Sequence, residues 1–406
     1  MNILLERFLR YIACDTQSDP ESAAKPSTAG QSALLEVLAG ELQAMGIQAQ
    51  IHPQGAVFAH IPANSAKKTP ALGFIAHVDT SPDVSGANIQ AKVVEHYDGQ
   101  DILLHPEKNI YLRVADFPGL VAYKGQMLIT TGGTTLLGAD DKAGVAILMH
   151  LAQYLTQHPG MEHGDIHLAF TSDEETGRGV EGFDIQAFGA DYAYTVDGGQ
   201  IGELDVENFN GALADLTVEG CNMHPGYASE KFKNALLLIQ EFNALLPLGE
   251  RPETTKDREG FYFLHHLQGD AGKATAQYLI RDHDRELFNR RKSFLEENAG
   301  LLNKKYGANT FTIRFTDQYY NMYDEIKKHI HLVENAVKAM EMAGVKPIIR
   351  PARGGTDGAR LSYMGLPCPN IFAGGHNFHS IYEYVPLESM QKSFEVIVNI
   401  VKLYCA

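Results

Sequence analysis

The sequence predicts an α/β protein in which a large domain with a mixed sheet is interrupted by a small ferredoxin-like domain. Residues 1–208 alternate helical patterns with short apolar strands, which is typical of a sheet covered by helices. Residues 209–322 follow the order βαββαβ, the complete split unit of a ferredoxin-like domain. The first pattern resumes in residues 323–406, so we expect this segment to complete the large domain.

Local patterns predict the elements of the first segment. Residues 1–12 carry apolar side chains at helical spacing and predict an amphipathic helix. A second helix is expected to begin with a capping box of Thr28 and Gln31 and to end at Gly46. Residues 82–130 show no regular pattern. Short apolar runs predict strands at 71–78, 166–171 and 192–196, with a helix at 142–155.

The inserted domain and the last segment are interpreted in the same way. The ends of strands in an α/β sheet and the cleft between two domains are the places where ligands usually bind, so we expect the substrate there. In the inserted domain we expect strands at 212–218, 261–267, 273–281 and 310–315 and helices at 229–246 and 285–305. In the last segment we expect helices at 332–343 and 387–403 and strands at 345–350 and 369–373.

The composition excludes several classes of protein. The 406 residues include 34 Lys and Arg against 50 Asp and Glu, which gives a formal net charge of −16. Such a chain repels phosphates and anionic headgroups, so we expect no nucleic-acid or membrane partner. No apolar run reaches the roughly 18 residues of a membrane span. The four cysteines are too few and too scattered for a disulfide framework, and we expect a cytoplasmic protein with reduced thiols.

Five polar clusters in the large domain follow predicted strands or loops. The strand period of two places His77 and Asp79 on one face, which suits a metal-binding histidine organised by a carboxylate. Three adjacent carboxylates after a strand repel one another unless a cation or a proton offsets their charge. The clusters are His77-Val78-Asp79, Asp140-Asp141-Lys142, Asp173-Glu174-Glu175, Asp197-Gly198-Gly199, and His379 with Glu383.

Each cluster alone has a plainer explanation, namely a surface pair, a helix cap or a solvated loop. Together, four acidic clusters at strand ends point to the same edge of one sheet. Two histidines with three or four carboxylates are typical ligands of two divalent ions, and zinc fits better than calcium or magnesium, which rarely recruit imidazole. Such a pair, roughly 3.5 to 4 Å apart, activates water and polarises a carbonyl, which predicts a hydrolase.

The order of these clusters carries a resemblance that extends along almost the whole chain. The chain resembles the tripeptide aminopeptidases of the dinuclear zinc metallopeptidase family, which also holds carboxypeptidases, dipeptidases and amino-acid deacylases. The acid pairs match the wider family. The runs Thr80-Ser81-Pro82-Asp83 and Arg353-Gly354-Gly355-Thr356-Asp357-Gly358 narrow the resemblance to the tripeptide aminopeptidases.

The resemblance implies a role for each residue of the metal site. Asp140 would bridge two zinc ions, one also held by His77 and Asp197, the other by Glu175 and His379. Glu174 would be the general base, and Asp79 would orient His77 or tune its metal. His376, three residues before His379, is a second imidazole that competes for the assignment, and the spacing to Glu383 favours His379.

Four residues are candidates for substrate binding. By the resemblance, His224 of the inserted domain would be the histidine that reaches the scissile carbonyl, although a loop histidine beside a proline needs no such role. Arg353 is suited to pair with the substrate carboxylate. Arg281 and Asn234 are weaker candidates, and an ion pair between Arg281 and Asp282 explains the former almost as well.

The preferred hypothesis is an aminopeptidase that hydrolyses the N-terminal peptide bond of tripeptides. A dipeptidase or an N-acyl amino-acid deacylase of the wider family is the alternative, because a metal site does not select a scissile amide. A metal-dependent binding protein without activity is the third hypothesis, which usually leaves a ligand or the base missing, and none is missing here. The inserted domain would act as a lid, and its exposed strands suggest a possible homodimer.

Overall fold

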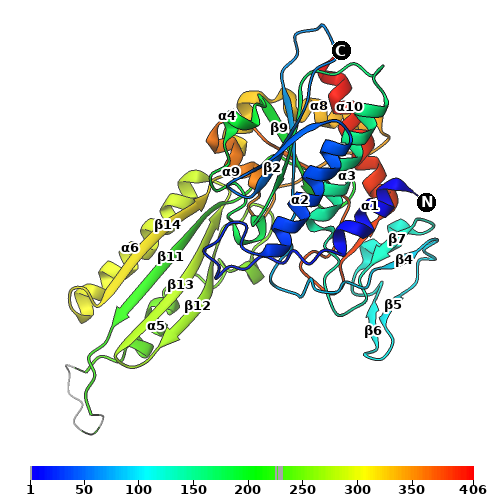
Figure 1. Cartoon of the computed structure of the whole chain (residues 1–406). Coiled ribbons are helices and arrows are strands. Elements are labelled where there is room, and N and C mark those ends of the chain that lie inside the picture. Colours follow the sequence, from blue (N-terminus) through cyan, green and yellow to red (C-terminus); the bar gives the residue numbers. More distant parts are fainter. Residues whose placement is uncertain (1, 225, 227–231) are drawn as a thin grey trace. The chain divides into compact units, whose positions relative to one another are not determined.

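The computed structural model describes residues 2–224, 226 and 232–406, and the chain divides into two compact units (Figure 1). The first unit consists of Met1–Val206, Glu325–Arg350 and Thr356–Ala406, and the second of Glu207–Asp324 and Pro351–Gly355. The borders expected after residues 208 and 322 lie two residues from those of this division, which come after 206 and 324. The grouping of 351–355 with the second unit was not expected.

The first unit is built on an eight-stranded mixed sheet, as predicted. Its strand order is β1-β2-β8-β3-β9-β16-β10-β15. The three predicted central strands, β8, β3 and β9, lie side by side and run parallel, and every residue of β3 is buried. The strands are β1 Gln48–His52, β2 Ala56–Ile61, β3 Leu72–His77, β8 Ile166–Thr171, β9 Tyr192–Gly198, β10 Glu203–Asp205, β15 Ile348–Ile349 and β16 Asn370–Phe372.

Among the helices, α3 (Ala139–Gln157) is the central one and contacts β3, β9, α1 and α10. Asp140 and Asp141 have non-helical backbone angles, so the regular helix begins at Lys142 as predicted. The short 3-10 helix η2 spans Glu174–Thr176. Apart from the α-helices of the inserted βαββαβ segment, the other α-helices of the described residues are α1 Ile3–Ile12, α2 Ala29–Ala44, α4 Ile185–Phe188, α7 Tyr323–Ile326, α8 His331–Met342, α9 Asp357–Met364 and α10 Leu387–Tyr404. The 3-10 helix η5 spans Lys327–His329.

The start of α2 differs from the prediction in its chemistry. Thr28 is the N-cap residue, but its side chain makes no capping hydrogen bond. The Gln31 amide instead donates to the hydroxyls of Ser27 and Thr28, so the expected capping box is wrong. The helix ends as predicted, because Gly46 adopts a φ of +81°, which favours glycine.

The segment 82–130, which shows no sequence pattern, forms small sheets of its own. β7 (Leu128–Thr130) pairs with β4 (Lys92–Val94) and with β17 (Tyr384–Pro386), and β5 (Ile102–His105) pairs with β6 (Ile110–Leu112). The 3-10 helix η1 spans Pro118–Tyr123. These strands have three or four residues each, which is too short for a periodicity of two to be read. A local apolar core holds them, with Tyr97, Leu104, Leu112, Leu120, Tyr123, Leu128 and Tyr384 buried.

The second unit has the predicted βαββαβ order. Its sheet runs β12-β13-β11-β14, all antiparallel, which is the strand order of the ferredoxin-like arrangement. The predicted helix 229–246 is α5, and its expected first residues, 229–231, lie outside the described residues. The elements are β11 Asn210–Glu219, α5 Ala235–Ala244, η4 Pro252–Thr254, β12 Phe261–Gly269, β13 Lys273–Asp282, α6 Arg285–Tyr306 and β14 Phe311–Tyr319.

One predicted strand is much shorter in the structure. The strand expected at 345–350 is reduced to the two residues of β15, which pair with β10. Over the described part of the chain, the search for a helix long and apolar enough to cross a membrane finds none.

Candidate metal centre

The ends of neighbouring parallel strands bring the predicted polar residues to one place. His77 is the last residue of β3, and Asp197 lies near the end of the adjacent β9. Glu174 and Glu175 form the start of η2, which begins three residues after the end of β8, the strand on the other side of β3. Asp140 joins them from the turn that precedes the regular part of α3. Strand direction therefore gathers groups that are up to 120 residues apart in sequence.

Asp140 lies between two imidazoles. Its Oδ1 is 3.0 Å from Nε2 of His77, and its Oδ2 is 3.2 Å from Nε2 of His379. Asp197 Oδ1 lies 3.4 Å from the same nitrogen of His77, and Glu175 Oε2 lies 2.8 Å from that of His379. The five side chains thus form two sets, each with one imidazole and one further carboxylate, which share Asp140.

These residues fit a pair of divalent ions. Two groups of described residues bring one ligand atom each to within 4.8 Å of one another, namely His77, Asp140 and Glu175, and His77, Asp141 and Asp197. Oε1 of Glu175 is buried and has no hydrogen-bond partner among the described residues, as expected for an oxygen that awaits a ligand. Imidazole mixed with carboxylate is a donor set that zinc accepts.

The buried carboxyl groups of the site also have shifted pKa values that favour bound cations. Burial raises the pKa of the Glu175 carboxyl to about 8 and that of Asp197 to about 7. Burial opposes charge on His379 as well, but its hydrogen bonds to Asp140 and Glu175 outweigh this effect and raise its pKa to about 11. Buried carboxylates need positive partners, and divalent cations at this place would supply them.

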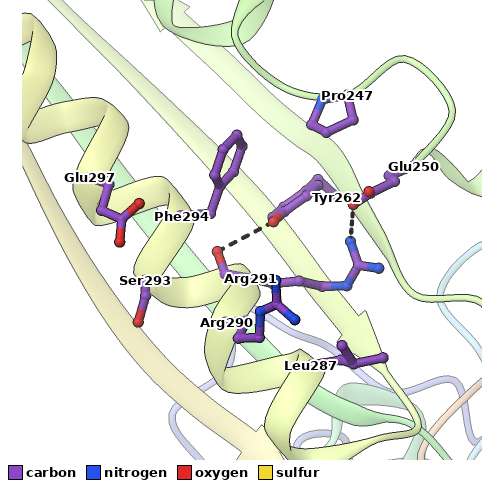
Figure 2. Close-up of a pocket in the computed structure, with 9 residues that line it drawn as sticks. All are labelled: Pro247, Glu250, Tyr262, Leu287, Arg290, Arg291, Ser293, Phe294 and Glu297. Carbon is purple, nitrogen blue, oxygen red and sulfur yellow. Dashed lines mark hydrogen bonds and ion pairs between the residues drawn. The ribbon is translucent and has the colours of Figure 1, made fainter.

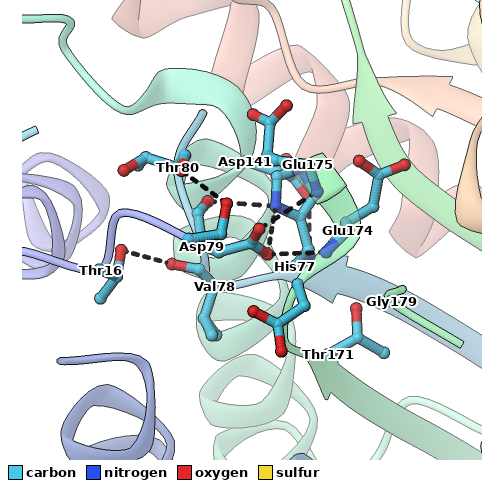
Figure 3. Close-up of polar contacts among 12 residues, drawn as sticks. Thr16, His77, Val78, Asp79, Thr80, Asp141, Thr171, Glu174, Glu175 and Gly179 are labelled. Atoms are coloured by element: carbon cyan, nitrogen blue, oxygen red, sulfur yellow. Dashed lines mark hydrogen bonds and ion pairs between the residues drawn. The ribbon is translucent and has the colours of Figure 1, made fainter. Parts of the chain in front are cut away.

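Asp79 organises the site through contacts with His77 and with the loop of the two glutamates (Figure 3). One of its carboxylate oxygens lies 3.3 Å from Nδ1 of His77. The same carboxylate accepts the backbone N–H groups of Glu174 and Glu175, each at 3.1 Å. Asp79 is fully buried, so it fixes both the ring of His77 and the loop that carries the two glutamates.

Asp173 does not belong to the group of acids expected to crowd at this edge. Its carboxylate accepts hydrogen bonds from the backbone N–H and the hydroxyl of Ser27 and from the amide of Gln31. The expectation of three mutually repelling carboxylates is therefore wrong for this residue. Asp173 adopts a φ of +65°, which turns its side chain toward α2 and away from its neighbours.

Two acids have positions that the sequence analysis did not foresee. Asp141 accepts the backbone N–H groups of His77, at 3.2 Å, and Gly144, at 3.1 Å. Glu383, which served only as a spacing marker, accepts three backbone N–H groups of the turn that carries Asp140. Hydrogen bonds between a side chain and a backbone group far away in sequence cannot be predicted from a local sequence pattern.

The two candidate imidazoles are separated by the structure. Nε2 of His376 lies 2.7 Å from the hydroxyl of Tyr123, and its ring stacks on Tyr384 with centroids 4.6 Å apart. Burial in this aromatic setting lowers the pKa of His376 to about 4. His379, not His376, reaches Asp140 and Glu175.

Comparison with known proteins identifies the family of the chain. The family model of peptidase family M20/M25/M40 matches residues 136–403. Peptidase T of Desulfitobacterium hafniense strain Y51 is 54% identical over 404 residues, which cover 100% of this chain and 98% of the relative. The chain belongs to the M20/M25/M40 peptidase family. The predicted metallopeptidase, and its predicted class of enzyme, are confirmed by this membership.

Solved structures of M20-type peptidases share the fold. An aminopeptidase PepT from Bacillus cereus ATCC 10987 superposes with a TM-score of 0.76 at 22% identity, covering 100% of this chain and 98% of that one. A tripeptidase from Staphylococcus aureus subsp. aureus Mu50 gives a TM-score of 0.78 at 20% identity, with 99% and 98% covered. The α/β fold predicted from the sequence is that of this peptidase family.

The four predicted substrate residues all lie in the second unit. His224 Nδ1 accepts the backbone N–H of Gly226 at 3.1 Å. Asn234 is the N-cap of α5, and its side chain accepts the N–H of Leu236. Their roles toward a substrate of the family stay predictions.

The two predicted arginines are held within the second unit. Arg353 donates to the carbonyl of Asp257 at 2.9 Å and to the hydroxyl of Thr255 at 3.0 Å. Arg281 is 8% exposed and donates to two backbone carbonyls of the sheet. Asp282 pairs with Arg291 at 2.7 Å, so the alternative ion pair between Arg281 and Asp282 is wrong.

The second unit also contains a cavity of about 400 Å³ beside α6 (Figure 2). Its most buried cation, Arg291, is paired with Asp282 and Glu250 and lies over the ring of Tyr262. Neither group of candidate metal ligands found in the described residues includes a residue of this cavity. Arg291 and Glu250, two of the charged residues that line the cavity, are therefore paired within the protein.

Proposed function

We propose that this chain is an aminopeptidase that hydrolyses the N-terminal peptide bond of tripeptides with the help of two zinc ions. The observation that carries the proposal is the Asp140 carboxylate placed between the imidazoles of His77 and His379, in a member of the M20/M25/M40 peptidase family. The relative named Peptidase T, 54% identical over the whole chain, supports the choice of reaction within that family.

The proposed ligands follow from the two sets that share Asp140. One zinc ion would be held by His77, Asp197 and Asp140, and the other by His379, Glu175 and Asp140. When bound, the two ions would supply an activated water and a polarised scissile carbonyl. Asp141 is a weaker candidate ligand, since its oxygens already accept the N–H groups of His77 and Gly144.

Glu174 is proposed as the general base. Its backbone is fixed by Asp79, and its neighbour Glu175 contacts His379, which leaves the Glu174 carboxyl for the substrate. Burial raises the pKa of Glu174 well above its usual range, with a further contribution from Asp357 and opposed by His77. A raised pKa suits a group that must take a proton from water and give it to the leaving amine.

The substrate would be bound in part by residues of the second unit. We propose that His224 stabilises the oxyanion and that Arg353 pairs with the carboxylate of the tripeptide, with Arg281 and Asn234 as further contacts. The peptide is the proposed partner, the cytoplasm is the proposed compartment, and a homodimer is the proposed assembly.

A substrate panel tests the proposed reaction. The zinc-loaded protein is assayed with a tripeptide, the dipeptide that lacks its last residue, and the N-acetylated tripeptide. We expect the free tripeptide to have the highest kcat/KM, because an aminopeptidase recognises a free amino terminus. A preference for the dipeptide would favour a dipeptidase, and equal cleavage of the acetylated form would favour a deacylase.

A further inference from the structure

Glu383 lies four residues after His379 and makes a set of contacts that the proposed chemistry does not explain. Its side chain is 1% exposed. Oε2 accepts the backbone N–H groups of Leu137 at 2.6 Å and Gly138 at 2.9 Å, and Oε1 accepts that of Asp140 at 3.1 Å. One buried carboxylate thus accepts three backbone N–H groups of the turn at the start of α3, where negative charge is favoured.

These contacts close a ring between two proposed metal ligands. Asp140 is joined to His379 directly, through its Oδ2 and the Nε2 of the histidine. It is joined a second time through its own backbone N–H, the Glu383 side chain and the short chain back to His379. The position of each ligand is therefore fixed relative to the other even before an ion binds.

The segment between the two residues needs such an anchor. Asn377 and His379 both have positive φ, 54° and 58°, a conformation that is costly for residues other than glycine. Internal bonds hold the turn, since the Ser380 hydroxyl donates to the carbonyl of Asn377 and accepts the N–H of Tyr382. Beyond Glu383, β17 pairs with β7, the strand that leads toward the Asp140 turn.

We infer that Glu383 is a positioning residue that presets the distance between Asp140 and His379 and thereby forms the second metal site, that of Asp140, Glu175 and His379. The inference rests on the two-ion site of the proposed function. The site of His77, Asp197 and Asp140 shares only the Asp140 end of this anchor, whereas the second site has both Asp140 and His379 joined to it, so the two ions should depend on Glu383 to different degrees. Residues that orient metal ligands typically contribute 10- to 100-fold in metal affinity.

The test is the Glu383→Gln variant, which offers one acceptor oxygen and turns an NH₂ group toward backbone donors. Calorimetric zinc titration of the metal-free protein should show one of the two affinities reduced by about 10- to 100-fold, with the other changed much less. At limiting zinc the metal content should fall from two ions per chain toward one. Excess zinc should restore kcat, because the chemistry itself is intact.

Two further variants separate positioning from general stability. Glu388→Gln is the matched control, since Glu388 also accepts a distant backbone N–H, that of Met127 at 3.1 Å, and should keep both affinities. Glu383→Asp retains two acceptor oxygens and should recover part of the lost affinity. If Glu383→Gln does not fold, a Glu383→Asp variant with both zinc affinities unchanged from the original protein would still overturn the inference.

Unchanged affinities in Glu383→Gln, or an equal loss at both sites, would also overturn it. Metal content and affinity do not depend on which peptide is cleaved. A protein that binds two ions normally but cleaves no tripeptide would refute the proposed function and leave this inference standing.

Discussion

At the scale of single residues, the site depends on two adjacent glutamates with different surroundings. Glu175 lies 2.8 Å from Nε2 of His379 and keeps a buried oxygen without a partner among the described residues. Glu174 has its backbone N–H bound by Asp79, and burial raises its pKa well above the usual range. Consecutive residues in the turn after β8 point in different directions, so one can bind metal while the other moves protons.

This division predicts opposite effects of two matched substitutions. Glu174→Gln should lower kcat by about 10²- to 10⁴-fold, the usual contribution of a general base, while zinc content stays near two per chain. Glu175→Gln should lower the zinc content itself. Kinetics and metal analysis of the same preparations check both, with Glu181→Gln, an exposed partner of Arg178, as the control that should change neither. Loss of zinc from Glu174→Gln would reassign the base.

The sequence predicts the ligands better than the residues that support them. His77 and Asp197 lie at the ends of neighbouring parallel strands and Glu175 lies in the turn after a third, so strand order takes these three ligands to one edge of the sheet. The supporting bonds join distant segments, such as the one from Ser27 to Asp173 over 146 positions. No local pattern reports such a partner, which is why the group of acids was predicted one residue too large.

At the scale of an element, the turn that carries the two glutamates is anchored to the start of α2 by Asp173. Three donors from Ser27 and Gln31 meet its carboxylate, and Thr176 donates to the Asp173 carbonyl at 3.1 Å. The turn η2 is therefore held both by hydrogen bonds to Ser27 and Gln31 and by a hydrogen bond between its own residues and Asp173. Its geometry should depend on the charge of a residue that touches neither metal nor substrate.

Asp173→Asn should displace this turn. An amide leaves one donor without an acceptor, so we expect about 1–3 kcal/mol lower unfolding free energy together with a reduced kcat. Asp184→Asn is the matched control, because Asp184 caps α4 through the N–H of Ala187 and asparagine is an equally good cap. Denaturant unfolding and steady-state kinetics on both variants check the prediction. A destabilised variant with normal kcat would show that the anchor serves stability alone.

Elements with a long pattern were the ones predicted well. α3, α6 and the βαββαβ order of the second unit agree with the structure, because their apolar positions repeat over many residues. The central strands agree because each is an almost unbroken apolar run. The segment 82–130 was not interpretable, since its strands have three or four residues and are held by a mixed aromatic core. The capping box failed for another reason, as Gln31 is recruited by Asp173.

At the scale of the whole molecule, part of the acidic excess behind the formal charge of −16 is concentrated in one place. Five carboxyl groups, those of Asp79, Asp140, Glu174, Glu175 and Asp197, lie around two imidazoles in one mostly buried centre. All five belong to the first unit, as do the two histidines. Cation binding should therefore stabilise this unit in particular, since it offsets the repulsion of acids that water cannot screen.

Removal of the metal should loosen the first unit and spare the second. Each ion present at 100 times its Kd contributes about 2.7 kcal/mol of stability to the state that binds it. Hydrogen exchange with and without a chelator should show faster exchange at the carboxyl ends of β3, β8 and β9, and unchanged exchange in β11, β13 and β14. Added zinc should restore the protection, whereas magnesium should not, because imidazole ligands favour zinc. Equal loss of protection in both units would mean that the metal centre stabilises the chain as one cooperative body, and the assignment of its effect to the first unit would then fail.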